Sequence, residues 1–308
     1  MSENSDWPDL PLSAWSDTCD TLQLWTQMVG KVRIAVTPLI NHWWNATFLV
    51  TARGLAAPAM SFAGGTFDIV FDFVEHRLVI DTSDGRAETM TLEPMTVAGF
   101  YAEFIKRLRR LGIEVQIRSM PCEIEGALPF ERDTVHAQYD PVFVQKFLQA
   151  LTQANRVLTE FRARFIGKAS PVHFFWGSFD LAVTRFSGRT APPPKGATPN
   201  VARRVMAEAY SHEVSSCGFW PGNGGYGRAA FYVYAYPEPA AYGDARLRTA
   251  GAFYDKGLGQ FILPYDAVRQ SNDPDMLLLG FLQETYEAAA DLANWDRKAL
   301  ERQPRAAV

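Results

Sequence analysis

The string HFFWGSF at residues 173–179 has a near-copy earlier in the chain, HWWNATF at residues 42–48. Each copy reads histidine, two aromatic residues, one variable residue, a small residue, a hydroxyl residue and phenylalanine. An apolar residue, a glycine and a lysine come before each copy, at residues 29–31 and 166–168. Self-similarity of this kind indicates that one structural unit occurs twice. The sequence therefore predicts two similar halves that arose by internal duplication.

The hydrophobic pattern around the copies predicts the same mixture of elements in each half. Alternating apolar residues predict a strand over 67–73, and apolar residues three and four apart predict a helix from Thr96 to Gly112. Further strands are expected over 76–81, 88–92, 228–236, 252–254 and 260–263, and further helices over 141–165 and 273–292. Each half then reads as a helix, several antiparallel strands and a helix. This order predicts an α+β fold.

A break in the pattern divides the chain. Pro121, Gly126 and Pro129 interrupt regular structure, and the apolar periodicity lapses around them. We expect a first half over residues 1–120, a connecting segment over 121–140 and a second half over 141–308. The two halves are expected to pack as one compact unit.

Composition excludes several classes of protein. The 308 residues are 47% hydrophobic, which is enough for a full core, and carry a net charge of -4 with no long basic run. That charge argues against nucleic acid as the main partner. No apolar run reaches the roughly 18 residues of a membrane helix, and the first part of the chain is too acidic for a signal peptide. Three cysteines without a CxxC pair fit a reducing compartment, so we expect a soluble, cytoplasmic protein of undetermined oligomeric state.

Familiar catalytic motifs are absent or incomplete. Gly222, Gly224 and Gly227 fit GxGxxG, but a proline precedes them and a strand pattern follows, whereas dinucleotide binding needs a strand before and a helix after. His212 and Glu213 begin like the zinc motif HExxH, but the second histidine is missing. Neither motif therefore identifies a reaction.

Polar residues inside the second copy of the repeat raise the question of what they face. If residues 173–185 form one unbroken strand, His173 and Arg185 face one side, and Trp176 and Asp180 face the other. A buried Asp180 or Arg185 needs a partner, because an unpaired charge in the interior is costly. One interpretation is an internal ion pair or a strand-end cap. The other is a set of polar anchors in an apolar cavity, with Arg185 binding a ligand carboxylate or phosphate.

Aromatic residues give a second indication of a cavity. Tyr232, Tyr234 and Tyr236 fall on one face of their strand. Rings with hydroxyl tips suit the wall of a small-molecule cavity or an interface, and equally a core whose hydroxyls reach the surface. The residues that we predict to bind a ligand are Trp44, Trp176, Asp180, Arg185, Trp220, Tyr232 and Tyr234.

Histidine is the best general acid or base in this sequence, because only histidine titrates near neutral pH unshifted. We predict His173, His212 and Glu213 as catalytic residues if the protein is an enzyme. His42 and His173 occupy matching places in the repeat, and with His212 they form a candidate site for a divalent metal such as zinc or iron. The alternative is that these histidines are hydrogen-bonded structural residues.

Two long strings resemble a bacterial protein family of unknown function. They are HFFWGSFDLAVTRFSGR at residues 173–189 and EAYSHEVSSCGFWPG at residues 208–222. Shorter strings at 29–33, 41–43 and 50–55 fit the same family, so the resemblance covers nearly the whole chain. It implies a soluble bacterial protein and supplies no activity, cofactor or site residue.

Three functions fit these observations. The first is a protein that binds a small, partly apolar ligand in an aromatic-lined cavity, as an enzyme if its histidines carry acid–base chemistry. The second is a metal-dependent hydrolase or oxidase, which requires at least three of His42, His173, His212 and Glu213 to converge. The third is a non-catalytic protein whose tyrosines form an oligomer or partner interface, which requires an exposed apolar patch.

Overall fold

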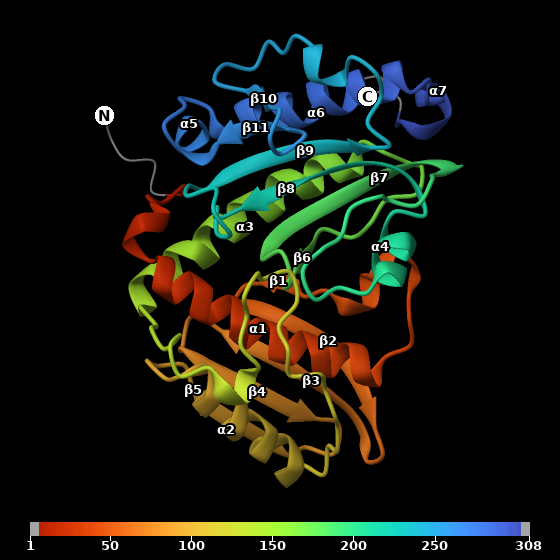
Figure 1. Ribbon diagram of the computed structural model, residues 1–308. Helices are drawn as coiled ribbons and strands as arrows, with labels where there is room; N and C mark the ends of the chain where they lie inside the picture. Colours follow the sequence, from red (N-terminus) through yellow and green to blue (C-terminus); the bar gives the residue numbers. More distant parts are fainter. Residues whose placement is uncertain (1–5, 303–308) are drawn as a thin grey trace, which may run out of the picture.

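The computed structural model describes residues 6–302, and within that range the strands form two antiparallel sheets (Figure 1). The first sheet is a meander in the order β1-β2-β3-β4-β5. Its strands are β1 (Leu49–Thr51), β2 (Gly54–Phe62), β3 (Gly65–Asp72), β4 (Arg77–Thr82) and β5 (Ala87–Thr91). Strand β3 buries the alternating residues Phe67, Ile69 and Phe71, as its sequence pattern predicts.

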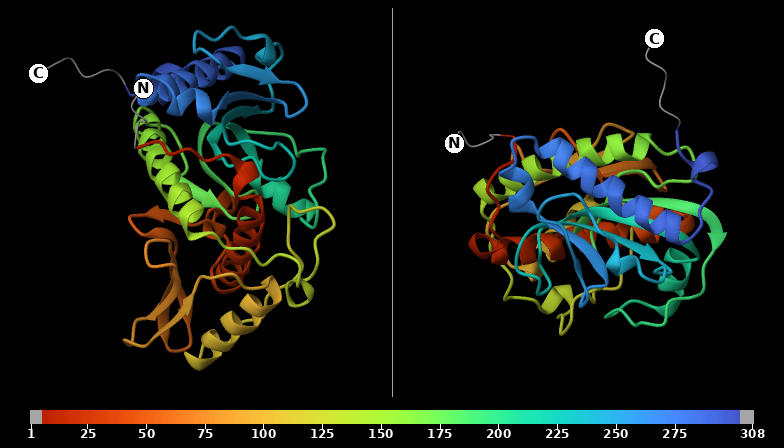
Figure 2. Two further views of the ribbon diagram at one scale, coloured as in Figure 1. Left: turned by 90° about the vertical axis from the view of Figure 1, so that its left-hand side faces the viewer. Right: turned by 90° about the horizontal axis from the view of Figure 1, so that it is seen from above.

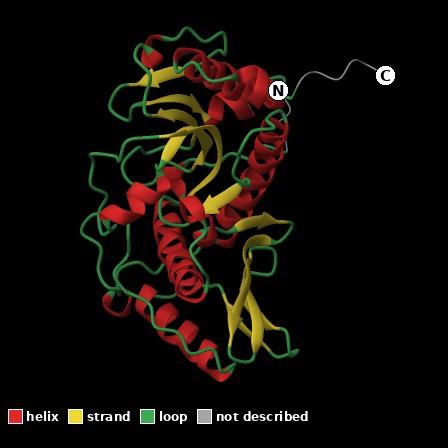
Figure 3. Ribbon diagram, turned by 90° about the vertical axis from the view of Figure 1, so that its right-hand side faces the viewer, coloured by secondary structure: helices red, strands yellow, loops and turns green. Residues whose placement is uncertain are grey.

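The second sheet has the order β10-β11-β9-β8-β7-β6. Its strands are β6 (His173–Phe175), β7 (Asp180–Thr190), β8 (His212–Trp220), β9 (Ala230–Tyr236), β10 (Phe253–Asp255) and β11 (Gln260–Pro264). Figure 3 shows the two sheets at opposite ends of the molecule. The predicted α+β class is therefore confirmed, with helices flanking both sheets.

Helices cover one face of the second sheet and fill the space between the sheets. Helix α3 (Pro141–Ala163) packs on β7 and β8, and α6 (Pro274–Leu292) packs on β8, β9 and β11 (Figure 2). Helix α1 (Ser16–Val36) lies between the sheets and contacts β2 and α2 (Val97–Arg110) (Figure 1). The shorter helices are η1 (Leu12–Ala14), η2 (Asn41–Ala46), η3 (Phe130–Arg132), α4 (Arg203–Ala209), η4 (Tyr242–Asp244), α5 (Tyr265–Arg269) and α7 (Arg297–Leu300).

Three of the long helices, α2, α3 and α6, begin at residues whose side chains cap them. The Thr96 hydroxyl accepts the Gly99 N–H at the start of α2, and Asp273 caps α6 ahead of a proline at the first helical position. Asp140 does the same at the start of α3, with its carboxylate accepting two backbone N–H groups. Such caps satisfy donors that have no partner inside the helix.

The two copies of the repeat lie against each other. Phe48 and Phe174 exchange a pair of backbone hydrogen bonds, 2.9 and 2.7 Å long, which join the end of one copy to the start of the other. Their backbones differ, because His42 and Trp43 are in a 3-10 segment with positive φ, whereas His173 is in strand β6. The structure does not show an internal duplication.

Residues 173–185 do not form one unbroken strand, the condition on which the expected facing of their side chains depended. The chain turns between β6 and β7, with the Phe179 N–H donating to the Phe175 carbonyl at 2.8 Å and Phe179 at φ 61°. In the resulting hairpin Phe175 pairs with Asp180. Because directly opposed residues share a face, Asp180 lies on the same face as Phe175, and Arg185 lies on the other.

Most buried apolar side chains of residues 6–302 belong to one continuous cluster that includes both halves. The division at 121–140 as a domain boundary stays a prediction, and the end of the chain after residue 302 lies outside the described range. In the described range no helix is both long and apolar enough to span a bilayer.

Candidate functional site

The face of the second sheet that α3 and α6 leave free is unusually polar. Strand register places Thr184, Ser216 and Tyr234 side by side across β7, β8 and β9. The Thr184 and Ser216 hydroxyls are 2.8 Å apart, so these groups hydrogen-bond within the row. The neighbouring row carries Tyr232, and Asp180 lies at the start of β7 on the same face. The opposite face packs mainly apolar side chains against α3 and α6, with Arg185 and Ser215 as its buried polar residues.

Two cavities lie against this polar face. Cavity A has a volume of about 1120 Å³ and cavity B a volume of about 500 Å³. They have several lining residues in common, which we call the shared wall: Glu123, Gly177, Ser178, Asp180, Tyr210, Tyr232 and Tyr234. A molecule in either cavity therefore meets the same carboxyl and phenol groups.

Asp180 is a buried carboxyl group within the shared wall. Its two oxygens accept hydrogen bonds from the hydroxyls of Ser178 and Tyr232. Burial nevertheless raises the pKa of Asp180, because desolvation disfavours the charged form more than the two hydrogen bonds favour it.

Glu123 faces the same cavities from the connecting segment. Glu123 is an exposed residue by its accessible surface, although many protein atoms lie around its carboxyl. This enclosure, with a smaller contribution from the charge of Asp180, raises the pKa of Glu123 to about 7. Glu123 has a positive φ of 61°, a sparsely populated conformation for a residue with a side chain. A side chain at Gly177 would overlap the Glu123 carboxyl, so glycine there permits the close approach.

Two glutamines on α1 hold these loops in place. Gln23 donates to the Gly177 carbonyl at 2.6 Å, and Gln27 donates to the Cys122 carbonyl at 2.9 Å. The Cys122 N–H donates back to Gln27 at 2.9 Å. Residues four apart lie on one face of a helix, so a single face of α1 positions both the Glu123 segment and the turn before Asp180.

Phenol groups complete the shared wall. The Tyr210 and Tyr234 hydroxyls are 3.1 Å apart, and the Tyr232 and Tyr234 rings stack with their centres 6.1 Å apart. Burial raises the pKa of each of these tyrosines, so all three are neutral donors and acceptors at physiological pH.

The charges that line the cavities differ from one cavity to the other. The lining of cavity A contains no lysine or arginine, and its carboxyl groups belong to Asp20, Glu123, Glu125, Asp133 and Asp180. Cavity B adds Lys31, Arg118 and Arg204. The Lys31 ammonium lies 6.0 Å from the centre of the Trp176 ring, near enough for a cation–π contact.

Trp176 requires glycine at position 30 of α1. A Cβ at Gly30 would overlap the Trp176 ring, whose N–H donates to the Ala46 carbonyl. We expect Gly30→Ala to lower the free energy of unfolding by about 1–3 kcal/mol, because overpacking outweighs the gain in helix propensity. Urea unfolding checks this, with Gly280→Ala in α6 as the control, since a Cβ at Gly280 makes only an ordinary contact with the Thr249 hydroxyl at 3.7 Å and the variant should gain stability. A stabilised Gly30→Ala protein would contradict the expectation.

Most of the predicted ligand-binding residues lie at these cavities. Trp44 and Trp176 line cavity B, Trp220 lines cavity A, and Asp180, Tyr232 and Tyr234 belong to the shared wall. The stripe of tyrosines and tryptophans around one acidic residue, which the sequence pattern indicates, therefore lies along these cavities, and its role in binding stays a prediction.

The placement of Arg185 contradicts its predicted role. Its guanidinium is fully buried on the helix-covered face, 3.4 Å from the Phe161 ring centre and 4.3 Å from that of Tyr286. It donates to the Phe161 carbonyl and is on the opposite face of the sheet from Asp180. Arg185 is therefore neither the partner of Asp180 nor a residue of either cavity.

The histidines predicted as metal ligands do not converge. His42 Nε2 lies 2.6 Å from Lys168 Nζ, and His173 Nδ1 lies 3.1 Å from the Thr47 hydroxyl. The rings of His42 and His212 have centres 5.5 Å apart, without a third ligand. Across residues 6–302, no cluster of three or more histidine, cysteine, aspartate or glutamate side chains is placed to hold a metal ion. The geometry does not support the predicted metal site.

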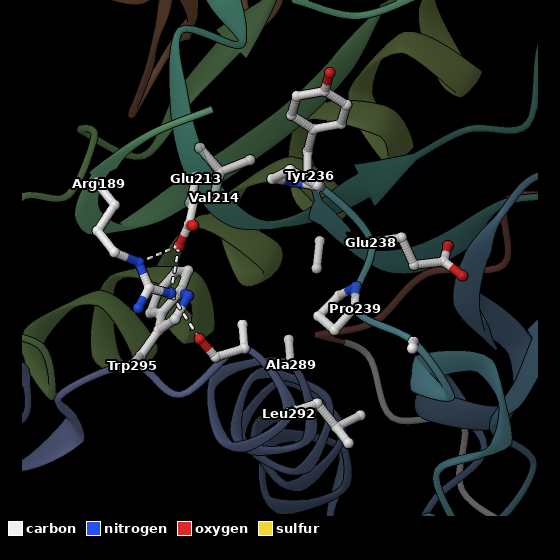
Figure 4. A pocket seen from close by; sticks show the side chains of 13 residues that line it. Arg189, Glu213, Val214, Tyr236, Glu238, Pro239, Ala289, Leu292 and Trp295 are labelled. Carbon is white, nitrogen blue, oxygen red and sulfur yellow. Dashed lines mark hydrogen bonds and ion pairs between the residues drawn. The ribbon is translucent and has the colours of Figure 1, made fainter. Parts of the chain in front are cut away.

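Two of the predicted catalytic groups also lie away from the shared wall. Glu213 accepts hydrogen bonds from Arg189 at 2.6 Å and from Ser187 at 2.9 Å, beside a separate cavity of about 230 Å³ (Figure 4). Arg189 also donates to carbonyls after the end of α6, so this ion pair fastens β7 and β8 to that helix. His212 is adjacent to Glu213 on β8 and points to the opposite face.

His173 is buried rather than poised to exchange protons. Burial lowers its pKa to about 3, so the ring is neutral across the physiological range. It lines neither cavity A nor cavity B.

Sequence reasoning missed four residues of the shared wall: Glu123, Gly177, Ser178 and Tyr210. Glu123 belongs to the connecting segment, and Tyr210 follows helix α4. The only available signal for Tyr210 was its place in the string at 208–222 that resembles a known family. Glu123 had no comparable signal.

A comparison with protein families matches residues 7–302 to a family of unknown function, DUF5996. The chain belongs to this family. The matched range contains both sheets, all the α-helices and the whole shared wall, so the DUF5996 unit is the complete architecture and not one half of it. Comparisons with curated proteins and with solved structures gave no match.

Proposed function

We propose that this DUF5996 protein binds a small, partly apolar molecule in cavities A and B, against the shared wall. One observation carries the proposal: the free face of a buried sheet presents carboxyl and hydroxyl groups to a cavity. A cavity with mainly aromatic walls and a few convergent polar groups is the usual form of a small-molecule site. The buried carboxyl of Asp180 would cost stability without offering any benefit to packing, which supports a role in binding.

If the bound molecule reacts, the carboxyl groups of the shared wall are better acid–base groups than the histidines. Glu123 reaches both cavities and has a pKa of about 7, which suits proton transfer at physiological pH. His173 and His212 line neither cavity A nor cavity B. The enzymatic form of the proposal therefore moves the general acid or base from histidine to Glu123.

An interface function has less support. It requires an exposed apolar patch formed by the tyrosines, but Tyr232 is buried and Tyr234 is half-buried. Both belong to the wall of a cavity. We propose the bacterial origin and the cytoplasmic location only on the sequence grounds given above.

A thermal-shift screen of small metabolites tests the proposal. We expect ligands that raise Tm by several degrees, as binding to the folded state alone requires. The ligand-induced rise in Tm should be smaller in the Tyr234→Phe and Asp180→Asn variants, which change polar groups of the shared wall without changing its shape. Tyr254→Phe is the control, because the Tyr254 hydroxyl bonds to Glu238 outside both cavities. The proposal fails if nothing raises Tm, or if every hit is retained in both wall variants.

A further inference from the structure

The two carboxyl groups of the shared wall have no cation beside them. Among residues 6–302, the groups that shift the pKa of Asp180, apart from burial, are Ser178, Tyr232 and its own backbone. The one group that shifts the pKa of Glu123, apart from burial, is Asp180. Lys31 is the lysine of cavity B, but its ammonium lies over Trp176 and influences neither carboxyl. Buried carboxylates in proteins are normally paired with a positive group.

The carboxyl oxygens of Glu123 and Asp180 can accept more hydrogen bonds than the protein donates to them. A carboxylate offers about four lone-pair positions. In the described chain Asp180 accepts one side-chain hydrogen bond on each oxygen, and no hydrogen bond to the Glu123 carboxyl is present. A group that complements this wall must therefore donate several hydrogen bonds. An ammonium group has three donors and no acceptor, whereas a carboxylate or phosphate has only acceptors.

The surroundings favour positive charge as well. The stacked rings of Tyr232 and Tyr234 lie beside the carboxyl groups, and aromatic faces attract cations. Cavity A adds the carboxyl groups of Asp20, Glu125 and Asp133 and no lysine or arginine, whereas cavity B adds Lys31, Arg118 and Arg204, so the negative charge is concentrated on the side of cavity A. Clefts lined by one sign of charge concentrate ligands of the opposite sign.

We propose that the joined cavities recognise a small organic amine, whose protonated nitrogen is held between Glu123 and Asp180. This inference rests on the proposed function, because it names the chemical class of the molecule that the cavities take. The apolar part of the ligand packs on the tyrosine and tryptophan rings, and the ammonium donates to the two carboxylates.

Binding is then coupled to the ionisation of Glu123. The pKa of about 7 means that much of the Glu123 population is protonated at pH 6, and an ammonium ligand binds the ionised form. Affinity should rise as pH increases from 6 to 8, while an alkyl amine stays protonated. The titratable groups of the shared wall beside Glu123 are Asp180, Tyr210, Tyr232 and Tyr234. Cavity A also has Asp20, Glu125, Asp133 and His136, and cavity B has Lys31, His42, Arg118, Cys122 and Arg204. The tyrosines stay neutral over this range because their pKa values are raised.

Isothermal titration calorimetry with matched amine and alcohol pairs tests the inference. The probes are benzylamine with benzyl alcohol, tyramine with tyrosol, and cyclohexylmethylamine with cyclohexylmethanol, at pH 6, 7 and 8. We expect at least one amine to bind at least tenfold more tightly than its alcohol, and more tightly at pH 8 than at pH 6. Glu123→Gln and Asp180→Asn should each weaken that binding about tenfold or more.

Glu131→Gln is the control variant. Glu131 belongs to the same connecting segment, and its exposed carboxylate accepts a hydrogen bond from Ser119. It lies outside both cavities, so the loss of its charge should leave amine binding unchanged. Circular dichroism of each variant verifies that it folds.

Several results would overturn the inference. They are alcohols that bind as tightly as amines, amine affinity that falls as pH rises, amine binding retained in both carboxyl variants, or no binding by any amine at millimolar concentration. If the metabolite screen still gives ligands that depend on Tyr234, the cavity function stands and only the amine class is wrong. If the screen also gives none, the proposed function itself fails.

Discussion

Trp25→Ala is expected to lower the free energy of unfolding by about 3–5 kcal/mol, the usual cost of truncating a large buried aromatic side chain. Trp25 is fully buried in α1. Its ring stacks on Phe100 of α2 with centres 4.4 Å apart, and on Tyr139 with centres 5.7 Å apart. Alanine would leave a void among three segments that the rest of the core holds rigid.

Urea unfolding followed by both circular dichroism and fluorescence measures this effect. Trp25→Phe is the matched control, because it keeps a ring against Phe100 and should cost clearly less. Since the core is continuous through both halves, we expect the two signals to report a single transition in each variant. A loss below about 1 kcal/mol for Trp25→Ala would show that the stacked rings of α1, α2 and the connecting segment contribute little to stability.

Elements with strong local patterns could be predicted from the sequence. Helix α3 combines an Asp140 cap, a proline at its first position and apolar residues at helical spacing, and the structure places it at Pro141–Ala163. Strand β3 alternates large apolar residues with others, and it forms as expected. In both cases neighbouring residues contain the information, so no knowledge of the tertiary contacts is needed.

The hairpin between β6 and β7 could not be predicted in the same way. Gly177 and Ser178 are common in turns, but the large rings beside them made the segment resemble a buried strand. Phe179 takes up a left-handed conformation, which phenylalanine disfavours. Its ring packs against Phe147 and Phe174 at 5.4 and 5.1 Å between centres, and this packing compensates for the local cost. The turn moves His173 to the face of Asp180, whereas Asp180 and Arg185 lie on opposite faces with or without it.

Glu123 shows the same limit for the site. Nothing near it in sequence indicates a cavity, because it occupies an irregular segment without periodicity. Its place depends on Gln27 binding Cys122 and on its own N–H donating to the Pro199 carbonyl at 2.8 Å. These contacts join segments that are far apart in the chain. Tyr232 and Tyr234 could be predicted to share a face because they lie within one strand. The Glu123 carboxyl opposite them could not be predicted.

Glu123→Gln should stabilise the protein at pH 8 relative to the wild type and have little effect at pH 4. The pKa of Glu123 rises from an ordinary 4.5 to about 7 on folding, so the folded state binds its proton more tightly than the unfolded state does. Ionisation therefore removes stability as pH increases from 4.5 to about 7, and glutamine cannot ionise. The full shift corresponds to about 3 kcal/mol, and water that reaches the carboxyl through the cavities reduces this to about 1 kcal/mol.

The measurement must be the difference between variant and wild type at each pH, because other groups oppose Glu123. Burial lowers the pKa of His173 from 6.5 to about 3, so His173 adds stability as pH rises across that window. Both proteins share this contribution, which cancels in the difference. Urea unfolding at pH 4, 6 and 8 should give a difference that grows with pH, and Glu131→Gln should give a flat one. If the difference in free energy of unfolding between Glu123→Gln and wild type does not change with pH, folding does not disfavour the ionised form of Glu123. A bound cation would then have no unfavourable ionisation to relieve.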